Sequence, residues 1–249
     1  MNKASSKNIV IFGATSRIAE CVAREFSARG DLLTLIGRNE AKLGLIAKDL
    51  TVRGAKEVRV HVQDLNKIEE LPTLIDGLFE ESSVDTVLVA HGVLPEQEVI
   101  QDDLPSVLNT LDLNFSSPMA ISLEVVKRFE EKDAGSLAVI TSVAGLRGRK
   151  SNYIYGTAKG ALILFLQGLR NRVGKTNVRV IDVRPGFVDT PMTAHLKKGA
   201  LFASPESVAK GIVLAIDKGK DIVYLPWFWR WIMLIIKSIP EFLFKKMSI

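Results

Sequence analysis

The chain has 249 residues, of which 47% are hydrophobic, and its formal net charge is +5. This length and apolar content suit one large α/β domain with a substantial core, and no linker-like change in composition divides the chain before about residue 222. The basic residues are scattered among acidic ones, which argues against nucleic-acid binding. The three histidines are too far apart in the sequence to suggest a metal site, and a single cysteine excludes an intramolecular disulfide.

The amino-terminal segment 1–8 is polar and has no apolar core of the kind found in secretory signal peptides. The single cysteine, Cys21, falls on the first predicted helix, where we expect it to pack rather than react. Both features favour a cytoplasmic protein in a reducing compartment.

Short apolar runs alternate with longer amphipathic stretches along the chain. The predicted strands are 8–12, 32–36, 57–62, 84–89, 136–141, 178–183 and 221–225. The predicted helices are 16–29, 39–52, 67–80, 104–131, 152–173 and 204–218, the last with Ser204 as its N-cap. This alternation with right-handed crossovers predicts a doubly wound α/β fold, in which helices cover both faces of a mainly parallel, seven-stranded sheet.

A glycine-containing turn follows the first predicted strand and leads into a helix. The residues of this turn are Gly13, Thr15, Ser16, Arg17 and Ile18. Strand, turn and helix in this order provide backbone N–H groups and a helix N-terminus that can bind a pyrophosphate. The pattern is weak when taken alone, because Arg17 and Ala19 stand where a G-x-x-x-G-x-G turn has glycines. A capped helix after a strand is the alternative.

The second predicted strand ends at Gly37-Arg38-Asn39. An NAD-selective site places a carboxylate here to accept hydrogen bonds from ribose hydroxyls. The planar guanidinium of Arg38 instead suits a ribose 2′-phosphate, which Ser16 and Arg17 would also approach. We therefore expect NADPH/NADP as the cofactor, with NADH as the second possibility, and reduction as the working direction. The alternative is that Arg38 is a surface charge at a helix start.

Three residues in the middle of the chain suit proton transfer. Ser142 follows the apolar run 137–140, at the strand edge where open parallel sheets place their chemistry. Tyr155 and Lys159 are four residues apart and share one helix face. An ammonium group there favours ionisation of a phenol, whose ordinary pKa is about 10, and so supplies a proton carrier near neutral pH. A chance surface pair is the alternative for these two residues alone.

With these motifs in this order, the chain resembles the short-chain dehydrogenase/reductase family over essentially its whole length. The resemblance implies a single Rossmann-type domain that transfers hydride between a nicotinamide cofactor and an alcohol or ketone. It implies a catalytic set of Asn114, Ser142, Tyr155 and Lys159. In this set Lys159 lowers the pKa of Tyr155 and holds the nicotinamide ribose, and Asn114 organises a water relay.

The resemblance also implies further cofactor contacts. These are Asp64, Leu65, Ala90, Gly92, Tyr155, Lys159, Pro185, Gly186, Val188 and Thr190. The chain departs from the family at Ala90-His91-Gly92, where Asn-Ala-Gly is usual, and we expect His91 to pack at the strand end. Tyr153 lies on another helix face than Tyr155, and we expect it to form a wall of the pocket.

Within the family, the carboxyl-terminal third is most similar to the reductases that complete the epimerisation of decaprenylphosphoryl ribose to arabinose. Segments 184–186, 193–197 and 239–246 and the closing Ile249 carry this resemblance. It implies a keto-pentose substrate, carried on a polyprenyl phosphate, and a place in cell-envelope biosynthesis.

An apolar tail, residues 226–249, follows the catalytic domain 1–225. All three tryptophans of the chain lie within 227–231. The apolar stretch of roughly a dozen residues is too short to cross a bilayer, which takes about 20. Arg230 and Lys237 share one narrow polar stripe, so this stretch is typical of a helix lying in the interface of an anionic membrane. Packing on the chain's own core or in a dimer interface is the alternative for the tail, and we expect the protein to form a homodimer or homotetramer.

A basic loop lies between Ser142 and Tyr155, and the predicted fold therefore brings it near the catalytic mouth. Its cations are Arg147, Arg149 and Lys150. They can receive the phosphate of a polyprenyl-phosphate substrate, face an acidic acyl carrier protein, or form a solvated loop.

Three functions follow in order of preference. The first is an NADPH-dependent reductase of a lipid-linked keto-sugar, peripheral to the inner face of the cell membrane. The second is a reductase of another apolar carbonyl, such as a ketoacyl thioester or a steroid-like ketone. The third is a non-catalytic NADP-binding scaffold, which has no physical need for the complete set of Asn114, Ser142, Tyr155 and Lys159.

Overall fold

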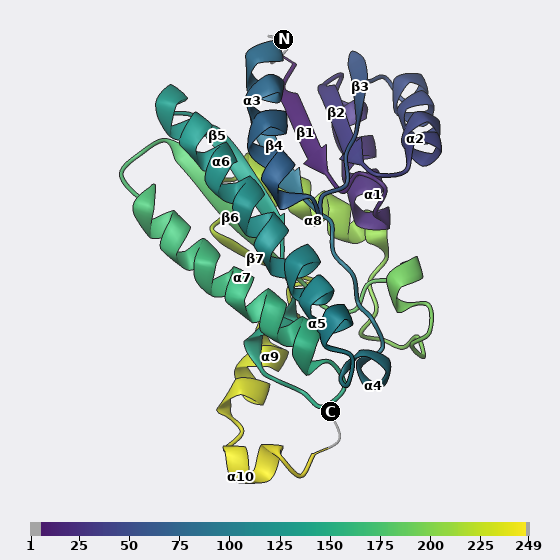
Figure 1. Ribbon diagram of the computed structural model, residues 1–249, viewed down its shortest axis with the longest axis vertical. Helices are drawn as coiled ribbons and strands as arrows, with labels where there is room; N and C mark the ends of the chain where they lie inside the picture. The colour runs from purple at the N-terminus through teal and green to yellow at the C-terminus, as the bar shows by residue number, and fades with distance from the viewer. Residues whose placement is uncertain (1–5, 248–249) are drawn as a thin grey trace.

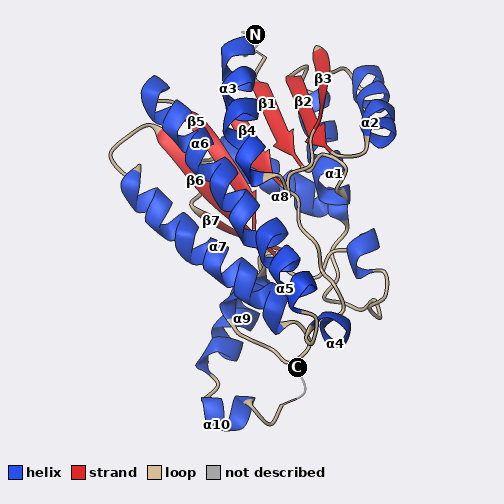
Figure 2. Ribbon diagram, viewed as in Figure 1, coloured by secondary structure: helices blue, strands red, loops and turns tan. Residues whose placement is uncertain are grey.

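Seven apolar runs form the strands of one sheet in the computed structural model, which describes residues 6–247 (Figures 1 and 2). The strands are β1 Asn8–Phe12, β2 Leu32–Gly37, β3 Glu57–Val62, β4 Thr86–Val89, β5 Gly135–Ile140, β6 Val178–Pro185 and β7 Ile222–Leu225. Their order is β3-β2-β1-β4-β5-β6-β7, and each neighbouring pair is parallel. The predicted doubly wound fold is confirmed. Ile249, which carried part of the resemblance, lies outside the described residues.

Ten α-helices are found within the described residues. They are α1 Arg17–Ser27, α2 Glu40–Val52, α3 Leu71–Glu81, α4 Gln97–Ile100, α5 Leu104–Leu111, α6 Ser117–Lys132, α7 Tyr153–Arg172, α8 Pro205–Asp217, α9 Trp229–Ser238 and α10 Glu241–Phe244. Helices α1, α2 and α8 bury their apolar side chains on one face of the sheet, and α3, α6 and α7 bury theirs on the other. The short α9 and α10 lie below the sheet, beyond the lower end of α7 in the view of Figure 1.

Burial on both faces follows from the alternation of side chains along each strand. In β1, Ile9 and Ile11 belong to the core beneath α1, α2 and α8, whereas Val10 and Phe12 belong to the opposite core. All four are at most 2% exposed. Burial of such side chains contributes about 1.5–3 kcal/mol each, so the central strands anchor the loops that follow them.

The strand order reverses at β1, which lies between β2 and β4. Successive crossovers therefore leave β1 and β4 in opposite directions, and a crevice opens beyond their carboxyl ends. Gly13 follows β1 and Ala90 follows β4, so the fold places both residues at this crevice.

The predicted helix 104–131 is divided by a π-helical turn, Asp112–Ser116, that contains Asn114. Pro118 lies four residues after Asn114 and has no N–H, so it cannot close an α-helical hydrogen bond to the Asn114 carbonyl. π-turns frequently mark functional sites. The sequence analysis also missed α4 and the 3-10 turns Val143–Leu146 and Pro191–Thr193, which are too short to show a periodic pattern.

Candidate active site

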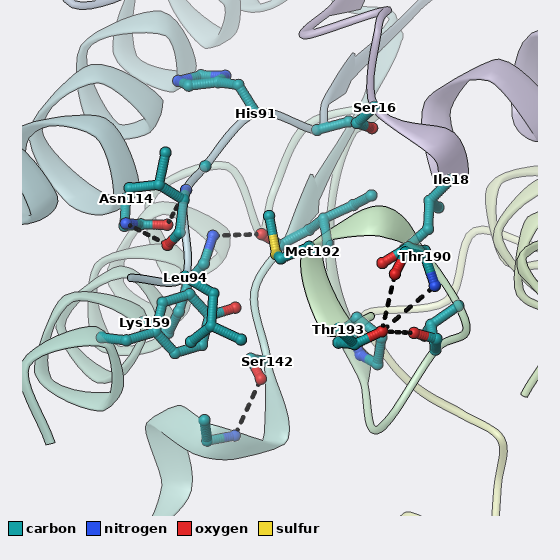
Figure 3. A pocket seen from close by; sticks show the side chains of 18 of the residues that line it. Ser16, Ile18, His91, Leu94, Asn114, Ser142, Lys159, Thr190, Met192 and Thr193 are labelled. Atoms are coloured by element: carbon teal, nitrogen blue, oxygen red, sulfur yellow. Dashed lines mark hydrogen bonds between the residues drawn. The ribbon is translucent and has the colours of Figure 1, made fainter. Parts of the chain in front are cut away.

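One cavity of about 860 Å³ opens at the carboxyl edge of the sheet (Figure 3). Every residue that the sequence analysis assigns to catalysis or cofactor binding lines it. These residues are Gly13, Thr15, Ser16, Arg17, Ile18, Arg38, Asp64, Leu65, Ala90, Gly92, Asn114, Ser142, Tyr155, Lys159, Pro185, Gly186, Val188 and Thr190. The fold thus brings together residues from six strand ends, and their cofactor roles remain predictions.

The turn after β1 requires glycine at its first position. Gly13 has a φ of +76°, and a Cβ there would lie 2.6 Å from the His91 backbone nitrogen. Ser16 caps α1, because its side chain accepts a hydrogen bond from the Ala19 N–H at 3.2 Å. The end of α1 that can bind an anion therefore faces the cavity.

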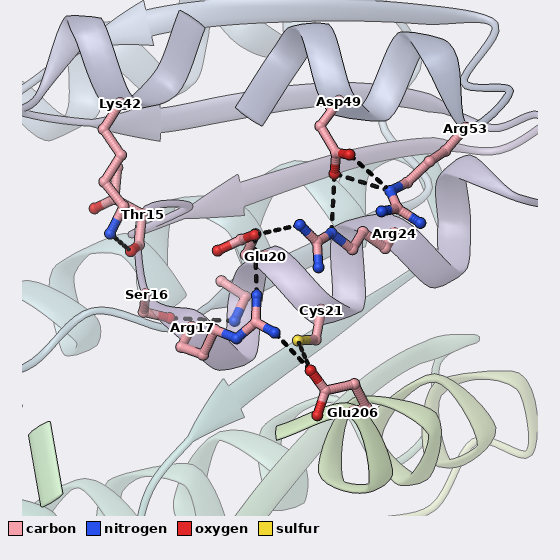
Figure 4. Close-up of polar contacts among 11 residues, drawn as sticks. Thr15, Ser16, Arg17, Glu20, Cys21, Arg24, Lys42, Asp49, Arg53 and Glu206 are labelled. Atoms are coloured by element: carbon pink, nitrogen blue, oxygen red, sulfur yellow. Dashed lines mark hydrogen bonds and ion pairs between the residues drawn. The ribbon is translucent and has the colours of Figure 1, made fainter. Parts of the chain in front are cut away.

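Cations gather at this end of the cavity (Figure 4). Arg17 is held between two carboxylates, with Glu20 at 3.0 Å and Glu206 at 2.6 Å. Lys42 donates a hydrogen bond to the Thr15 carbonyl oxygen at 2.7 Å and was not anticipated as a site residue. Arg38 is exposed and forms no ion pair with any residue of the described chain. Arg38 and Lys42 are therefore available to a phosphate without breaking a carboxylate contact.

Two glycines, Gly145 and Gly160, allow the elements that carry the predicted catalytic residues to approach closely. A Cβ on Gly145 would lie 2.6 Å from the backbone nitrogen of Gly160, so the turn Val143–Leu146 packs directly against α7. This contact brings Ser142 to the face of α7 that carries Tyr155 and Lys159. The Ser142 side chain accepts a hydrogen bond from the Ala144 N–H at 3.0 Å, which leaves its own proton to donate.

Burial dominates the pKa values of Tyr155 and Lys159, the predicted catalytic pair. It raises the pKa of Tyr155 to about 12, against opposing contributions from Ser142 and Arg149. It lowers the pKa of Lys159 to about 8, against the raising effect of Asp182. The expectation that Lys159 would lower the Tyr155 pKa is not met in this structure, because desolvation of the phenol outweighs the charges around it. At neutral pH the phenol is protonated.

Asn114 is completely buried, and its side chain binds the backbone. Its Oδ1 accepts from the Val93 N–H at 3.2 Å, and its Nδ2 donates to the carbonyl oxygens of Val93 and Thr110 at 3.0 and 2.9 Å. Gly92 must be small here, since a Cβ would lie 2.5 Å from Asn114 Oδ1. The side chain is thus committed to backbone groups of α5 and of the loop after β4.

His91 and Tyr153 differ in their relation to the cavity. His91 lines it, but its Nε2 lies 2.9 Å from the Ser117 hydroxyl, and burial together with Lys159 lowers its pKa to about 3. It is therefore neutral, as suits a packing residue. Tyr153 was expected to form a pocket wall, and this is wrong: it is 43% exposed and does not line the cavity. Two positions along a helix turn the side chain to a different face.

A network of hydrogen-bonded polar side chains supports the strand ends next to Ser142. Asp182 is fully buried and accepts hydrogen bonds from Thr141 at 2.6 Å and from Arg184 at 2.8 Å. Arg184 in turn donates to the Tyr224 hydroxyl at 2.8 Å. This network ties β5, β6 and β7 together at the edge where Ser142 and Pro185 lie. Sequence spacing gave no sign of it, because its members come from three strands.

The far end of the cavity is formed by segments that carry no recognisable motif. Helix α9 contributes Trp229, Ile232 and Ile236 to its wall. Gln97 of α4 and Asn152 before α7 lie there too, and the sequence analysis missed both.

The three cations of the basic loop take separate places. Arg149 lines the cavity, Lys150 is exposed outside it, and Arg147 turns to the tail. Arg147 donates to the Ile239 carbonyl oxygen at 3.2 Å, pairs with Glu241 at 2.7 Å and stacks over the ring of Phe244. A joint phosphate receptor built from all three cations is therefore excluded.

The tail packs partly on the chain's own core. Trp229 and Met233 are at most 3% exposed and contact Val143 and Phe187. The opposite face exposes apolar side chains, including Trp231 at 56% and Ile235 at 68%. None of the helices within residues 6–247 combines the length and the apolar character that a bilayer crossing demands.

Comparisons with known proteins agree with this architecture. The family model described as short chain dehydrogenase matches residues 7–200. A protein of Mycobacterium tuberculosis named as an uncharacterized oxidoreductase is 30% identical over 248 residues, which are 99% of each chain. An uncharacterized oxidoreductase of Streptomyces coelicolor is 31% identical over 98% of this chain and 96% of its own.

Solved structures share the fold at lower identity. The bulky-bulky ketone specific alcohol dehydrogenase from Comamonas testosteroni superposes with a TM-score of 0.80 at 22% identity, covering 96% of both chains. An actinorhodin polyketide ketoreductase variant with NADPH gives 0.80 at 20% identity, covering 90% of this chain and 97% of its own. A short-chain dehydrogenase from Sphingobium yanoikuyae in complex with NADPH gives 0.81 at 20% identity, covering 94% and 97%.

Proposed function

The chain belongs to the short chain dehydrogenase family, an oxidoreductase family acting on alcohol and ketone groups, and from this membership we propose that it reduces a ketone with NADPH. The observation that carries the proposal is the convergence of Ser142, Tyr155 and Lys159 on one cavity whose other end is cationic. A non-catalytic scaffold would need the cationic end alone.

The residues of the cavity fit NADPH. The capped end of α1 and the turn at Gly13 suit the pyrophosphate, and Arg38 with Lys42 suits a 2′-phosphate. Two of the solved structures with this fold were determined with NADPH. When bound, the cofactor supplies a hydride, two electrons with one hydrogen, to the carbonyl carbon.

The chain's own residues supply the proton and the charge stabilisation. The Ser142 hydroxyl donates to the carbonyl oxygen and orients it. Tyr155, protonated at neutral pH because its pKa is about 12, transfers its proton from the phenol oxygen to the developing alkoxide. Lys159, with a pKa of about 8, is mostly ammonium at pH 7 and stabilises the phenolate that results. A proton from solvent restores Tyr155, so each turnover consumes one ketone, one NADPH and one proton.

The preferred substrate is a lipid-linked keto-sugar, a keto-pentose on a polyprenyl phosphate. The resemblance of the carboxyl-terminal third supports it, as does the position of α9 in the cavity wall. The apolar side chains Ile232 and Ile236 in that wall favour a second candidate, another apolar carbonyl such as a ketoacyl thioester or a steroid-like ketone.

The tail supports a peripheral contact with the cytoplasmic face of the cell membrane. Its outer face exposes Trp227, Trp231, Leu234, Ile235, Phe242 and Leu243. Four cations of the tail are exposed as well: Arg230, Lys237, Lys245 and Lys246. The single acidic residue of the tail, Glu241, is already paired with Arg147. An apolar face together with exposed cations matches an anionic lipid surface, and it would place the cavity mouth near a lipid-linked substrate in cell-envelope biosynthesis.

The test is oxidation of NADPH by the purified full-length protein, followed at equal concentrations of three ketones: a polyprenyl-phosphate-linked keto-pentose, a ketoacyl thioester and a steroid ketone. The proposal predicts the highest kcat/KM with the keto-pentose. Turnover of the steroid or thioester alone would select the second candidate, and the absence of turnover with all three would contradict a ketone reductase.

A further inference from the structure

We call the far end of the cavity, opposite its cationic end, the substrate end. Four buried polar atoms there have no hydrogen-bond partner within residues 6–247. They are Gln97 Nε2, Arg149 Nε, Asn152 Oδ1 and Trp229 Nε1, and all four residues line the cavity. Buried polar groups are almost always paired, so unpaired ones that line one cavity point to a ligand that satisfies them.

The neighbours of these side chains hold them in place. Gln97 is 6% exposed, and its Oε1 accepts a hydrogen bond from the Ile154 N–H at 3.1 Å, which commits the oxygen and leaves the amide nitrogen available. Trp229 is 3% exposed and lies edge-on to Phe187, with ring centroids 5.4 Å apart. Its Nε1 would lie 1.9 Å from a Cβ on Gly186, so the indole donor sits directly over that loop.

Asn152 is the N-cap residue of α7, yet its side chain makes no capping hydrogen bond. Asparagine is among the best capping residues, and giving up that bond destabilises the helix start. The Asn152 side chain therefore lines the cavity, where a ligand can reach it, and does not cap α7.

Arg149 is the cation of this group. It forms no ion pair within the described part of the chain, and it is close enough to Tyr155 for each to shift the pKa of the other. Arg147 is engaged with the tail, and Lys150 does not line the cavity. A largely desolvated guanidinium without a carboxylate is costly, and an oxyanion in two-point contact would satisfy it.

We propose that Arg149, Gln97, Asn152 and Trp229 form a receptor for an anionic, hydroxylated part of the ketone substrate. The guanidinium pairs with an oxyanion, a phosphate or a carboxylate, and the three neutral side chains bind hydroxyl groups. This inference rests on the proposed ketone reduction and narrows the substrate class, since a neutral steroid-like ketone has no oxyanion to pair with the Arg149 guanidinium. The oxyanion can belong to a lipid phosphate or to a soluble sugar phosphate.

The test compares Arg149→Gln with Lys150→Gln, which removes the neighbouring charge outside the cavity. Ribulose 5-phosphate and ribulose, which differ only in the phosphate, are the ketone probes with NADPH. Loss of one charge-assisted contact should reduce the preference for ribulose 5-phosphate over ribulose, as a ratio of kcat/KM values, by about 10- to 100-fold in Arg149→Gln. Lys150→Gln should keep the wild-type ratio. An unchanged ratio in Arg149→Gln would overturn the inference.

A binding measurement separates this inference from the proposed activity. Titration calorimetry of the full-length protein with NADP gives the Kd of ribulose 5-phosphate and of a short-chain polyprenyl-phosphate keto-pentose. Weaker binding of these compounds to Arg149→Gln than to the wild type supports the receptor, even if no ketone is turned over. Absence of turnover would contradict the proposed reductase activity but not the receptor. Tighter binding of the polyprenyl compound identifies the lipid phosphate as the source of the oxyanion. Equal Kd values for the wild type and Arg149→Gln, or no binding of either compound to the wild type, would overturn the proposed receptor.

Discussion

Lys159 donates a hydrogen bond from Nζ to the carbonyl oxygen of Ile140, at 3.0 Å. Ile140 ends β5 and Ser142 follows two residues later, so one strand end positions both the lysine and the serine. The buried carboxylate of Asp182, on the neighbouring strand β6, favours the charged form of Lys159. The charge of Lys159 is therefore held by the core of the sheet rather than by a loop.

The pH dependence of reduction should follow Lys159. Its pKa of about 8 means that the ammonium is lost as the pH rises through that value, whereas Tyr155 keeps its proton up to about 12. We expect kcat/KM to be constant below about pH 7 and to fall above about pH 8, approaching tenfold per unit. Because the Asp182 carboxylate raises the pKa of Lys159, the Asp182→Asn variant should have a lower Lys159 pKa. The fall in kcat/KM should therefore begin at a lower pH in this variant than in the wild type. A profile flat to the ordinary lysine pKa of 10.5 would contradict the assignment.

Acid should destabilise the fold through His91. The pKa of His91 is about 3 in the folded protein and 6.5 ordinarily, so the unfolded chain binds the proton more tightly. The free energy of unfolding should decrease as the pH falls from about 6.5 towards 3, by up to about 1.4 kcal/mol per pH unit. Urea unfolding at a series of pH values measures this. His91→Gln should lack this component, and an identical pH dependence of the two proteins would show that His91 does not contribute it.

Cofactor preference should depend on Arg38. Replacing it in Arg38→Glu removes the proposed partner of the 2′-phosphate and adds a repulsive charge. The KM for NADPH should rise about 10- to 100-fold, while the KM for NADH changes less than about threefold. Lys48→Glu makes a charge change of the same size on the exposed face of α2, outside the cavity, and should alter neither KM. An equal increase of the KM for NADPH and the KM for NADH in Arg38→Glu would mean that Arg38 does not bind the 2′-phosphate.

If the tail contacts a membrane, negative charges placed on its exposed apolar face should reduce binding to vesicles, and a negative charge placed elsewhere should not. The double variant Trp231→Asp and Ile235→Asp places carboxylates on the exposed apolar face, and Leu45→Asp does so on a remote exposed leucine. Co-sedimentation with phosphatidylglycerol-containing vesicles should fall about fivefold or more for the double variant and not for Leu45→Asp. The alternative is that this face is a subunit interface. Light scattering, which measures the molar mass in solution, would support that alternative if the double variant becomes monomeric while its co-sedimentation with vesicles is unchanged.

Much of this fold was predictable because its signals are local. The predicted strands 8–12 and 57–62 matched β1 and β3 in full. β1 is a continuous apolar segment buried on both faces, whereas β3 is a partly exposed edge strand whose valines alternate with polar residues. The spacing of Tyr155 and Lys159 was equally local. The division of 104–131 by a π-turn was not anticipated, although Pro118 at the fourth position after Asn114 was a signal in the sequence.

The substrate end of the cavity could not be predicted in the same way. Gln97, Asn152 and Trp229 come from three segments far apart in the chain, and none has a spacing that indicates a site. The different fates of Arg147 and Arg149 depend on the position of α10, which places Glu241 beside the first of them. Such contacts arise from tertiary packing, and only the structure reveals them.

The most direct test of ketone reduction by this chain is the rate of the Tyr155→Phe variant, which keeps the ring and removes the proton donor. The proposed chemistry predicts that kcat falls at least about 100-fold, while the Kd for NADPH, measured by fluorescence titration, stays within about threefold. Tyr153→Phe, two residues away and outside the cavity, should retain wild-type kcat. Undiminished kcat in Tyr155→Phe would contradict the assignment of Tyr155 as the proton donor.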